Sequence, residues 1–225
     1  MCGRYVAPDD AAIEREFNLV RAEWQFPESY NVAPTQLVPV VRMREGLRVG
    51  RLLRWGLIPF FARGVPPKYS TINARMETVQ SSACYREPWA RGQRCLLPAR
   101  GFYEWQTRPD GSKTPYYIHL EDQEIFALAG LWERSPSEGG EWIESCVHLT
   151  LPANRLVGEI HNTQHRMPAI LTREAREAWL TGTPAQAWAA LAPYPDEHMV
   201  AWPVSTRVNK PANNDAGLIA PLAAA

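Results

Sequence analysis

Short strand-like runs separated by tight-turn signals occupy most of this chain, and they limit its fold more than any other feature. The runs at 37–43 and 47–53 flank Glu45-Gly46, which signals a hairpin, and Asp110-Gly111 marks another tight turn. Further strands are predicted at 94–97, 102–106, 116–120, 125–132, 147–151 and 199–204. Because strands and helices do not alternate regularly, we expect an α+β or mainly β architecture.

Only two or three short helices are predicted, each with a recognisable start. They lie at 10–17 behind Asp9 as the N-cap, at 173–180 behind Thr172, and from Pro184 behind Thr183. The sequence contains no repeat, linker or low-complexity boundary. We therefore expect a single domain over 1–225, with a loosely ordered tail over 210–225.

Composition narrows the functional classes. The 24 Lys and Arg residues balance the 24 Asp and Glu residues, which excludes a globally basic nucleic-acid binder but leaves room for a local basic groove. No apolar run approaches the roughly 20 residues that span a bilayer, and no signal peptide is evident, so we expect a cytoplasmic protein. The four cysteines are scattered without C-x-x-C pairing, which speaks against a zinc ribbon or a disulfide framework.

The second residue is a cysteine, and this position gives it unusual chemistry. Methionine aminopeptidases remove the initiator when the next side chain is small, so we expect Cys2 to become the N-terminal residue. It then carries an α-amine and a thiol on adjacent carbons, with ordinary pKa values of about 8 and about 8.5. Such a 1,2-aminothiol reacts with an aldehyde to give a Schiff base and then a thiazolidine ring.

Two further residues are candidates for proton transfer. Glu104 lies in the aromatic run at 102–106, where apolar surroundings would raise its pKa toward neutrality; the alternative is a solvent-facing carboxylate. His161 is a second candidate. His161 and His165 have the spacing of two metal ligands on one helix face, but the segment lacks the glutamate of H-E-x-x-H, so we expect neither a metal nor a cofactor.

Several cationic, amide and aromatic side chains suit nucleic acid. Asn73 and Arg75 alternate along one extended segment, and the guanidinium of arginine matches phosphate. A local phosphate-binding groove is predicted from Arg4, Arg75, Arg166 and Arg207. Aromatic rings near 55–61 are suited to stacking on bases, although core packing is the ordinary role of each ring.

Taken in order along the chain, these segments resemble the SRAP (SOS response-associated peptidase) family of abasic-site processing proteins. The matching stretches are Met1-Cys2-Gly3-Arg4, Tyr30-Asn31-Val32-Ala33-Pro34, Trp55-Gly56-Leu57-Ile58-Pro59, 72–78 (INARMET), Gly101-Phe102-Tyr103-Glu104-Trp105, Arg166-Met167-Pro168, and Val204-Ser205 with Val208-Asn209. The resemblance implies a compact β-rich domain with a barrel-like core. It also implies recognition of abasic sites in single-stranded DNA, with a thiazolidine crosslink at Cys2 that shields the lesion.

The resemblance also implies roles for individual residues. Cys2, Asn73, Glu104 and His161 match the family's active-site positions. The DNA-facing positions are Arg4, Asn31, Phe61, Arg75, Thr150 and Arg166. The expected partner is single-stranded DNA carrying an abasic site, with replication-fork proteins as further candidates. We expect a monomer that associates with the nucleoid when bound to DNA, with weak strand-cleaving activity and self-removal of Met1.

The sequence departs from the family pattern in two places. Phe60 and Phe61 stand where family members often carry tryptophan, and the segment 162–165 separates His161 from Arg166-Met167-Pro168, so His165 competes with His161 for the active-site role. Two other functional classes stay open. One is a cysteine peptidase with Cys2 as its nucleophile, and the other is a single-strand binding module in which Cys2 is incidental.

Overall fold

The computed structural model describes residues 2–22 and 24–222, and its centre is a closed barrel of five strands. Around the barrel the order is β11, β10, β7, β4, β5 and back to β11. The barrel strands are β4 (Leu37–Arg44), β5 (Leu47–Trp55), β7 (Arg94–Ala99), β10 (Phe126–Pro136) and β11 (Trp142–Pro152). The α+β, β-rich fold class with a barrel-like core is thereby confirmed.

A parallel contact between β5 and β11 closes the barrel, whereas the other four pairings are antiparallel. Arg54 pairs with Ser145 and Trp55 with Cys146 across this seam. Side chains alternate along a strand, so every second residue of each strand points into the barrel. The middle of the interior is filled by fully buried side chains that include Val40, Leu53 and Trp55.

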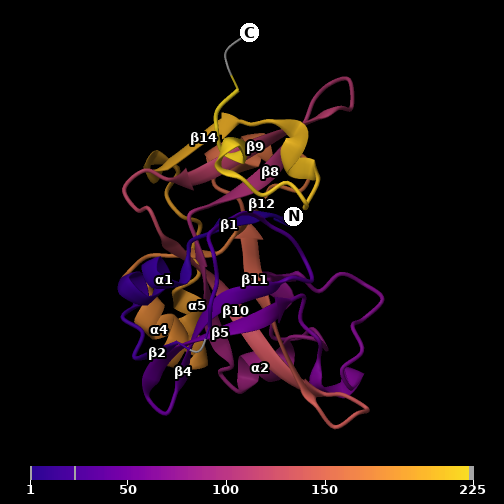
Figure 1. Ribbon diagram of the computed structural model, residues 1–225, viewed down its shortest axis with the longest axis vertical. Coiled ribbons are helices and arrows are strands. Elements are labelled where there is room, and N and C mark those ends of the chain that lie inside the picture. The colour runs from indigo at the N-terminus through magenta and orange to yellow at the C-terminus, as the bar shows by residue number, and fades with distance from the viewer. Residues whose placement is uncertain (1, 23, 223–225) are drawn as a thin grey trace.

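A second sheet of five strands lies at one end of the barrel, as Figure 1 shows along the long axis of the molecule. Its order is β14 (Met199–Pro203), β9 (Lys113–Leu120), β8 (Gly101–Thr107), β1 (Tyr5–Ala7) and β3 (Ser29–Val32). Four short strands extend the barrel sheet: β2 (Arg21–Ala22), β6 (Asn73–Arg75), β12 (Arg166–Pro168) and β13 (Ile170–Leu171). Strand β1 belongs to the second sheet and lies where that sheet meets the barrel in Figure 1, so the start of the chain is held at their junction.

The helices are short and pack outside the barrel. They are α1 (Asp10–Phe17), α2 (Arg86–Ala90), α3 (Arg155–Ile160), α4 (Ala175–Thr181) and α5 (Pro184–Ala189), with 3-10 turns η1 (Phe60–Ala62), η2 (Met76–Thr78), η3 (Asp196–His198), η4 (Thr206–Asn209) and η5 (Ala216–Leu218). Helices α1, α4 and α5 gather on one side of the barrel (Figure 1). Asp9 caps α1 by accepting from Ala12 N, and Thr183 forms a capping box at α5, both as the sequence predicts.

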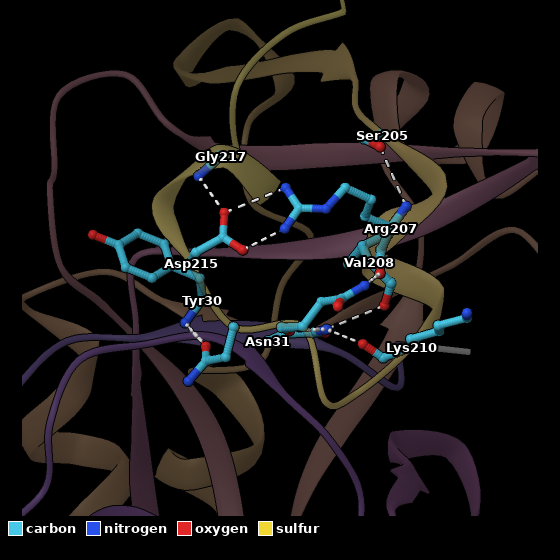
Figure 2. A network of polar contacts seen from close by, with 10 residues as sticks. Tyr30, Asn31, Ser205, Arg207, Val208, Lys210, Asp215 and Gly217 are labelled. Atoms are coloured by element: carbon cyan, nitrogen blue, oxygen red, sulfur yellow. Dashed lines mark hydrogen bonds and ion pairs between the residues drawn. The ribbon is translucent and has the colours of Figure 1, made fainter.

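The segment after Lys210 differs from the expected loose tail over its described part, 210–222. Asp215 pairs with Arg207 at 2.6 Å, and Leu218 is fully buried in a small apolar cluster with Tyr103 and Val208. Figure 2 shows the segment folded back across the second sheet. Polar contacts and a single buried leucine hold it, without a repeating hydrophobic pattern, so composition gives little sign of its order. Residues 223–225 lie outside the described residues.

No helix in the described ranges combines the length and the apolar character that a bilayer crossing requires.

Candidate functional site

Cys2 is buried at the junction of the barrel and the second sheet, with 1% of its surface exposed. Its thiol donates a hydrogen bond to the carbonyl of Arg4 at 3.6 Å. Burial, reinforced by the nearby Glu104 carboxylate, raises the pKa of the Cys2 thiol well above 9.0. The thiol is therefore protonated at neutral pH and needs a proton acceptor before it can react.

Glu104 points inward from β8 and is 2% exposed, which excludes the solvent-facing alternative. Burial raises the pKa of its carboxyl to about 7, in agreement with the expectation from the sequence. Its Oε1 atom has no hydrogen-bond partner among the described residues. A carboxyl in this state is well matched to proton transfer near neutral pH.

His161 lies beside Glu104 at the end of α3, with Nδ1 3.8 Å from Oε1 of the carboxyl. The same nitrogen is 2.9 Å from the carbonyl oxygen of Arg166. A carbonyl oxygen can only accept, so Nδ1 carries the proton and Nε2 holds the lone pair of the neutral ring. Burial lowers the pKa of His161, which keeps the ring neutral at physiological pH.

The segment after α3 is fastened to β8, and this contact explains why the histidine meets the glutamate. The Asn162 side chain accepts from Thr107 N at 3.0 Å and donates to Thr107 O at 2.8 Å. His165 is exposed, with φ +49°, and its Nδ1 lies 3.1 Å from the carbonyl of Gly158. Of the two histidines, the structure brings only His161 to Glu104.

Asn73 reaches the same region from β6, which pairs in parallel with β11. It is 9% exposed, and its Oδ1 atom lacks a partner within the described part of the chain. Arg75, two residues further on, is exposed. An unsatisfied amide oxygen in a buried position is costly in a folded protein, so this atom is suited to receive a donor from a ligand.

His148 is a site residue that the sequence analysis did not identify. It is the register partner of Asn73 on β11, is fully buried, and packs 5.6 Å from the Trp55 ring. Burial lowers the pKa of His148 to about 4, and the Leu149 carbonyl, 3.3 Å from Nδ1, together with the nearby Cys2 backbone offsets this only in part. Its position in an apolar strand, Val147-His148-Leu149, was the available signal.

Arg4 and Asn31 tie the start of the chain to residues about two hundred positions later. Arg4 donates to Asn31 Oδ1 at 3.0 Å and to the Val208 carbonyl at 2.6 Å. The buried Asn31 amide donates to the carbonyls of Val208, Lys210 and Asn213 at 3.2, 3.1 and 2.8 Å. Figure 2 shows how these bonds converge on Asn31 from the folded-back segment. Arg4 and Asn31 therefore fix the backbone near Cys2 to the folded-back segment.

Arg166 and Thr150 form a second buried unit on β12 and β11. Arg166 contacts the Glu77 carboxylate at 2.5 and 3.1 Å and donates to the Thr150 carbonyl at 2.6 Å. Thr150 is fully buried and Arg166 is 9% exposed. The carbonyl of Arg166 in turn accepts from His161, so this unit fixes the histidine ring.

Phe61 lies away from these groups. It is 60% exposed on η1, whose neighbour Phe60 contacts the Trp142 ring at 6.5 Å, near the β10–β11 turn. The predicted site residues thus separate into a buried set around Cys2, an exposed Arg75, and a remote exposed phenylalanine.

Two hollows reach members of the buried set other than Cys2 itself. One, of about 430 Å³, is lined by Glu104 and His161 together with Lys113 and Asn209. The other, of about 360 Å³, is lined by Asn73 and Arg75. Within the described ranges no three His, Cys, Asp or Glu side chains are grouped to hold a metal ion. The arrangement combines a thiol with a carboxyl and an imidazole, whose pKa values burial moves from their ordinary ranges.

Comparison with known proteins places this geometry among related chains. Residues 1–211 match the family described as SOS response associated peptidase (SRAP). The abasic site processing protein YoqW of Bacillus subtilis is 37% identical over 227 residues, and the match covers 97% of this chain and 99% of YoqW. The abasic site processing protein HMCES of Gallus gallus is 32% identical over 268 residues, covering 99% of this chain and 78% of its own.

A solved structure agrees with the fold. A crystallised protein from Bacteroides thetaiotaomicron superimposes with a TM-score of 0.89 at 28% identity, covering 99% of this chain and 100% of that one.

Proposed function

The chain belongs to the SOS response associated peptidase (SRAP) family, and we propose that it recognises abasic sites in single-stranded DNA and crosslinks itself to them through Cys2. The observation that carries this proposal is the buried Glu104 carboxyl, with a pKa of about 7, placed beside both Cys2 and His161. Relatives named abasic site processing proteins cover nearly the whole chain and support the same substrate.

The chemistry begins at the amine that becomes free when Met1 is removed. That amine adds to the C1′ aldehyde of the opened deoxyribose and loses water, which gives a Schiff base. The Cys2 sulfur then bonds to the same carbon while its proton passes to the nitrogen, closing a thiazolidine ring. The adduct therefore has the mass of protein plus DNA minus one water.

Glu104 and His161 carry the protons for these steps. Near pH 7 the Glu104 carboxyl is present in both forms, so it can donate to the opening sugar and accept from the amine or the thiol. Neutral His161 offers a second acceptor. The Oδ1 atom of Asn73, which has no hydrogen-bond partner among the residues that the structure describes, accepts from the amine or a sugar hydroxyl and orients it.

We assign DNA contact to the accessible residues of the predicted set and positioning to the buried ones. Arg75 and the half-buried Arg4 hold phosphates, and Phe61 stacks on a base. Buried Asn31, Thr150 and Arg166 act through the backbone segments and the imidazole that they fix. Weak strand cleavage from the Schiff base and self-removal of Met1 belong to the same site. We place the protein in the cytoplasm as a monomer that meets abasic DNA on the nucleoid, with replication-fork proteins as candidate partners.

A cysteine peptidase is the alternative that the family description carries. A peptidase nucleophile works as a thiolate, whereas burial keeps the Cys2 thiol protonated. This difference favours a reaction that starts at the amine. A peptidase would turn over added peptides, but a crosslinker is consumed one aldehyde per chain.

Intact-protein mass spectrometry tests the proposal, using a single-stranded oligonucleotide with one abasic site. We expect a stable adduct of the chain lacking Met1, no adduct with Cys2→Ala, and at most a reducible Schiff base with Cys2→Ser. Equal crosslinking by both variants, or no adduct from folded protein lacking Met1, would overturn it. An undamaged oligonucleotide is the control; equal affinity for both strands without an adduct would indicate a simple binding module.

A further inference from the structure

The barrel has two mouths, and the Cys2 site occupies only one of them. Strand β11 runs from Trp142 at the far mouth to Thr150 beside the site, which is about 26 Å at 3.3 Å per residue. Figure 1 shows this strand rising from the β10–β11 turn toward β1. A hollow of about 540 Å³ lies at the far mouth.

Arginines line this far mouth from three barrel strands. Arg42, Arg44, Arg51 and Arg134 surround the hollow, and among the described residues Glu144 is the one carboxylate in its lining. Strand register turns them inward: Arg134 is opposite Glu144, and Arg42 is opposite the interior Cys95. Glu144 also lies 3.9 Å from Arg134, and Glu45 lies 3.7 Å from Arg44 outside the lining. The described lining still holds more cationic than anionic side chains, which favours an anionic ligand.

Arg42 shows that the mouth is a built site. It is only 7% exposed, and its Nη2 contacts both oxygens of Glu144 at 3.0 and 3.2 Å. Its Nη1 is buried without a hydrogen-bond partner in the described ranges. The Glu144 carboxylate therefore uses only some of the hydrogen-bond donors of the Arg42 guanidinium.

Aromatic rings distinguish this mouth from a simple anion site. Arg42 stacks over Trp132 at 4.1 Å and Arg134 over Trp142 at 4.5 Å. Trp142 is 51% exposed and contacts Phe60, which lines a neighbouring hollow with Phe61 and Arg63. Alternating guanidinium groups and exposed ring faces suit phosphates and bases of a single strand.

We propose that the far mouth of the barrel is a second DNA-binding site that holds undamaged single-stranded DNA flanking the lesion. Phosphates bind the exposed Arg44 and Arg134, and a base stacks on Trp142 and Phe60. This inference rests on the proposed function. It also gives a role to exposed Phe61, which lines the hollow beside Trp142 and not either hollow at the Cys2 end. Spanning the two mouths requires roughly eight stacked nucleotides at 3.4 Å each.

The test compares Arg44→Gln/Arg134→Gln with the charge-matched control Arg86→Gln/Arg91→Gln, whose exposed arginines pair with Glu87 outside the hollow. Binding of an undamaged strand of roughly 20 nucleotides is followed by fluorescence anisotropy across salt concentrations. Each lost phosphate contact lowers the slope of log affinity against log salt by about 0.7, so we expect a fall of about 1.4 for the first pair and none for the control.

A third variant tests base stacking on Trp142, and its expected readout differs from that of a misfolded protein. Trp142→Ala should weaken binding of the same strand about fivefold or more while leaving the salt slope unchanged. The second site would be overturned if Arg44→Gln/Arg134→Gln had the same salt slope as wild type. It would also be overturned if the slope fell by the same amount in the control variant. Retained affinity in Trp142→Ala would overturn base stacking there.

Crosslinking of a short abasic strand separates this inference from the proposed function. A strand of roughly five nucleotides centred on the lesion cannot reach the far mouth. Failure of wild-type protein to crosslink it would defeat the Cys2 chemistry, whereas the salt slopes would still decide the far mouth. We expect wild type to crosslink a roughly 20-nucleotide abasic strand faster than the short one, and Arg44→Gln/Arg134→Gln to lose that advantage.

Discussion

Nδ1 of His161 lies 3.8 Å from Oε1 of Glu104, and only 5% and 3% of the two side chains are exposed. They are neighbours without a shared hydrogen bond, because the imidazole proton is already donated to the Arg166 carbonyl. Folding thus leaves the carboxyl oxygen without a partner in the described part of the chain. The pair is set up for an incoming group rather than for stability.

The stability of the protein should depend on the ionisation of Glu104. Its pKa rises from 4.5 to about 7 on folding, so the folded state holds more protons than the unfolded state between these values. This contribution is complete below about pH 4.5 and is lost as the pH rises through about 7. We expect Glu104→Gln to match wild type near pH 4 and to be up to about 3 kcal/mol more stable near pH 8.

Urea unfolding near both pH values checks this expectation. Glu45→Gln, which alters an exposed carboxylate, is the control and should show no such change. The same stability difference between Glu104→Gln and wild type at both pH values would contradict the raised pKa.

His161 and His165 should differ sharply in crosslinking. Asparagine is suited to both positions because it tolerates the φ of +49° at His165. We expect His161→Asn to slow single-turnover crosslinking by about 10²–10⁴-fold, since it removes a proton-transfer group. His165→Asn should stay within about twofold of wild type. Gel analysis of adduct against time measures both, and a reversed order would move the active-site role to His165.

Loss of the Asn31 amide should loosen the folded-back segment. Asn31→Ala removes donors to three carbonyls and should cost about 1–3 kcal/mol of unfolding free energy. Trypsin should then cleave faster after Arg207, whereas the bond after Lys210 is protected in either case because Pro211 follows it. Ser29→Ala, which loses one exposed bond to Asn214, is the matched control. Unchanged cleavage in Asn31→Ala would show that Asn31 does not anchor the segment.

Gly101 should not tolerate even one added carbon. An alanine Cβ there would lie 2.3 Å from the Tyr117 ring, whose hydroxyl donates to the Arg100 carbonyl. We expect Gly101→Ala to destabilise the fold by about 1–3 kcal/mol through overpacking. Gly139→Ala, with its nearest neighbour at 3.8 Å, should be close to neutral. Thermal unfolding of both variants decides the point, and equal midpoints would refute the steric conflict.

Local signals predicted the local structure well. The helix at Asp10–Phe17, the hairpin turn at Glu45-Gly46 and the capped start of α5 all agree with the sequence, because side-chain capping and turn chemistry act within a few residues. The short helices α2 and α3 were not predicted. They are five and six residues long, too short for a helical pattern to stand out.

Long-range features escaped the sequence analysis. The parallel seam pairs Trp55 with Cys146, and strands so far apart in the chain leave no turn signal between them. For the same reason His148 was read only as part of a core strand, although folding brings it beside Cys2 and Asn73. Glu104 and His161 could be singled out because a polar group among apolar neighbours is visible locally.

The hydrogen bond from Arg4 to the Val208 carbonyl joins residues 204 positions apart. During synthesis the start of the chain leaves the ribosome long before its partner exists. The surroundings of Cys2 are therefore completed only when the distant segment arrives, so the site cannot form on a chain that is truncated before Val208.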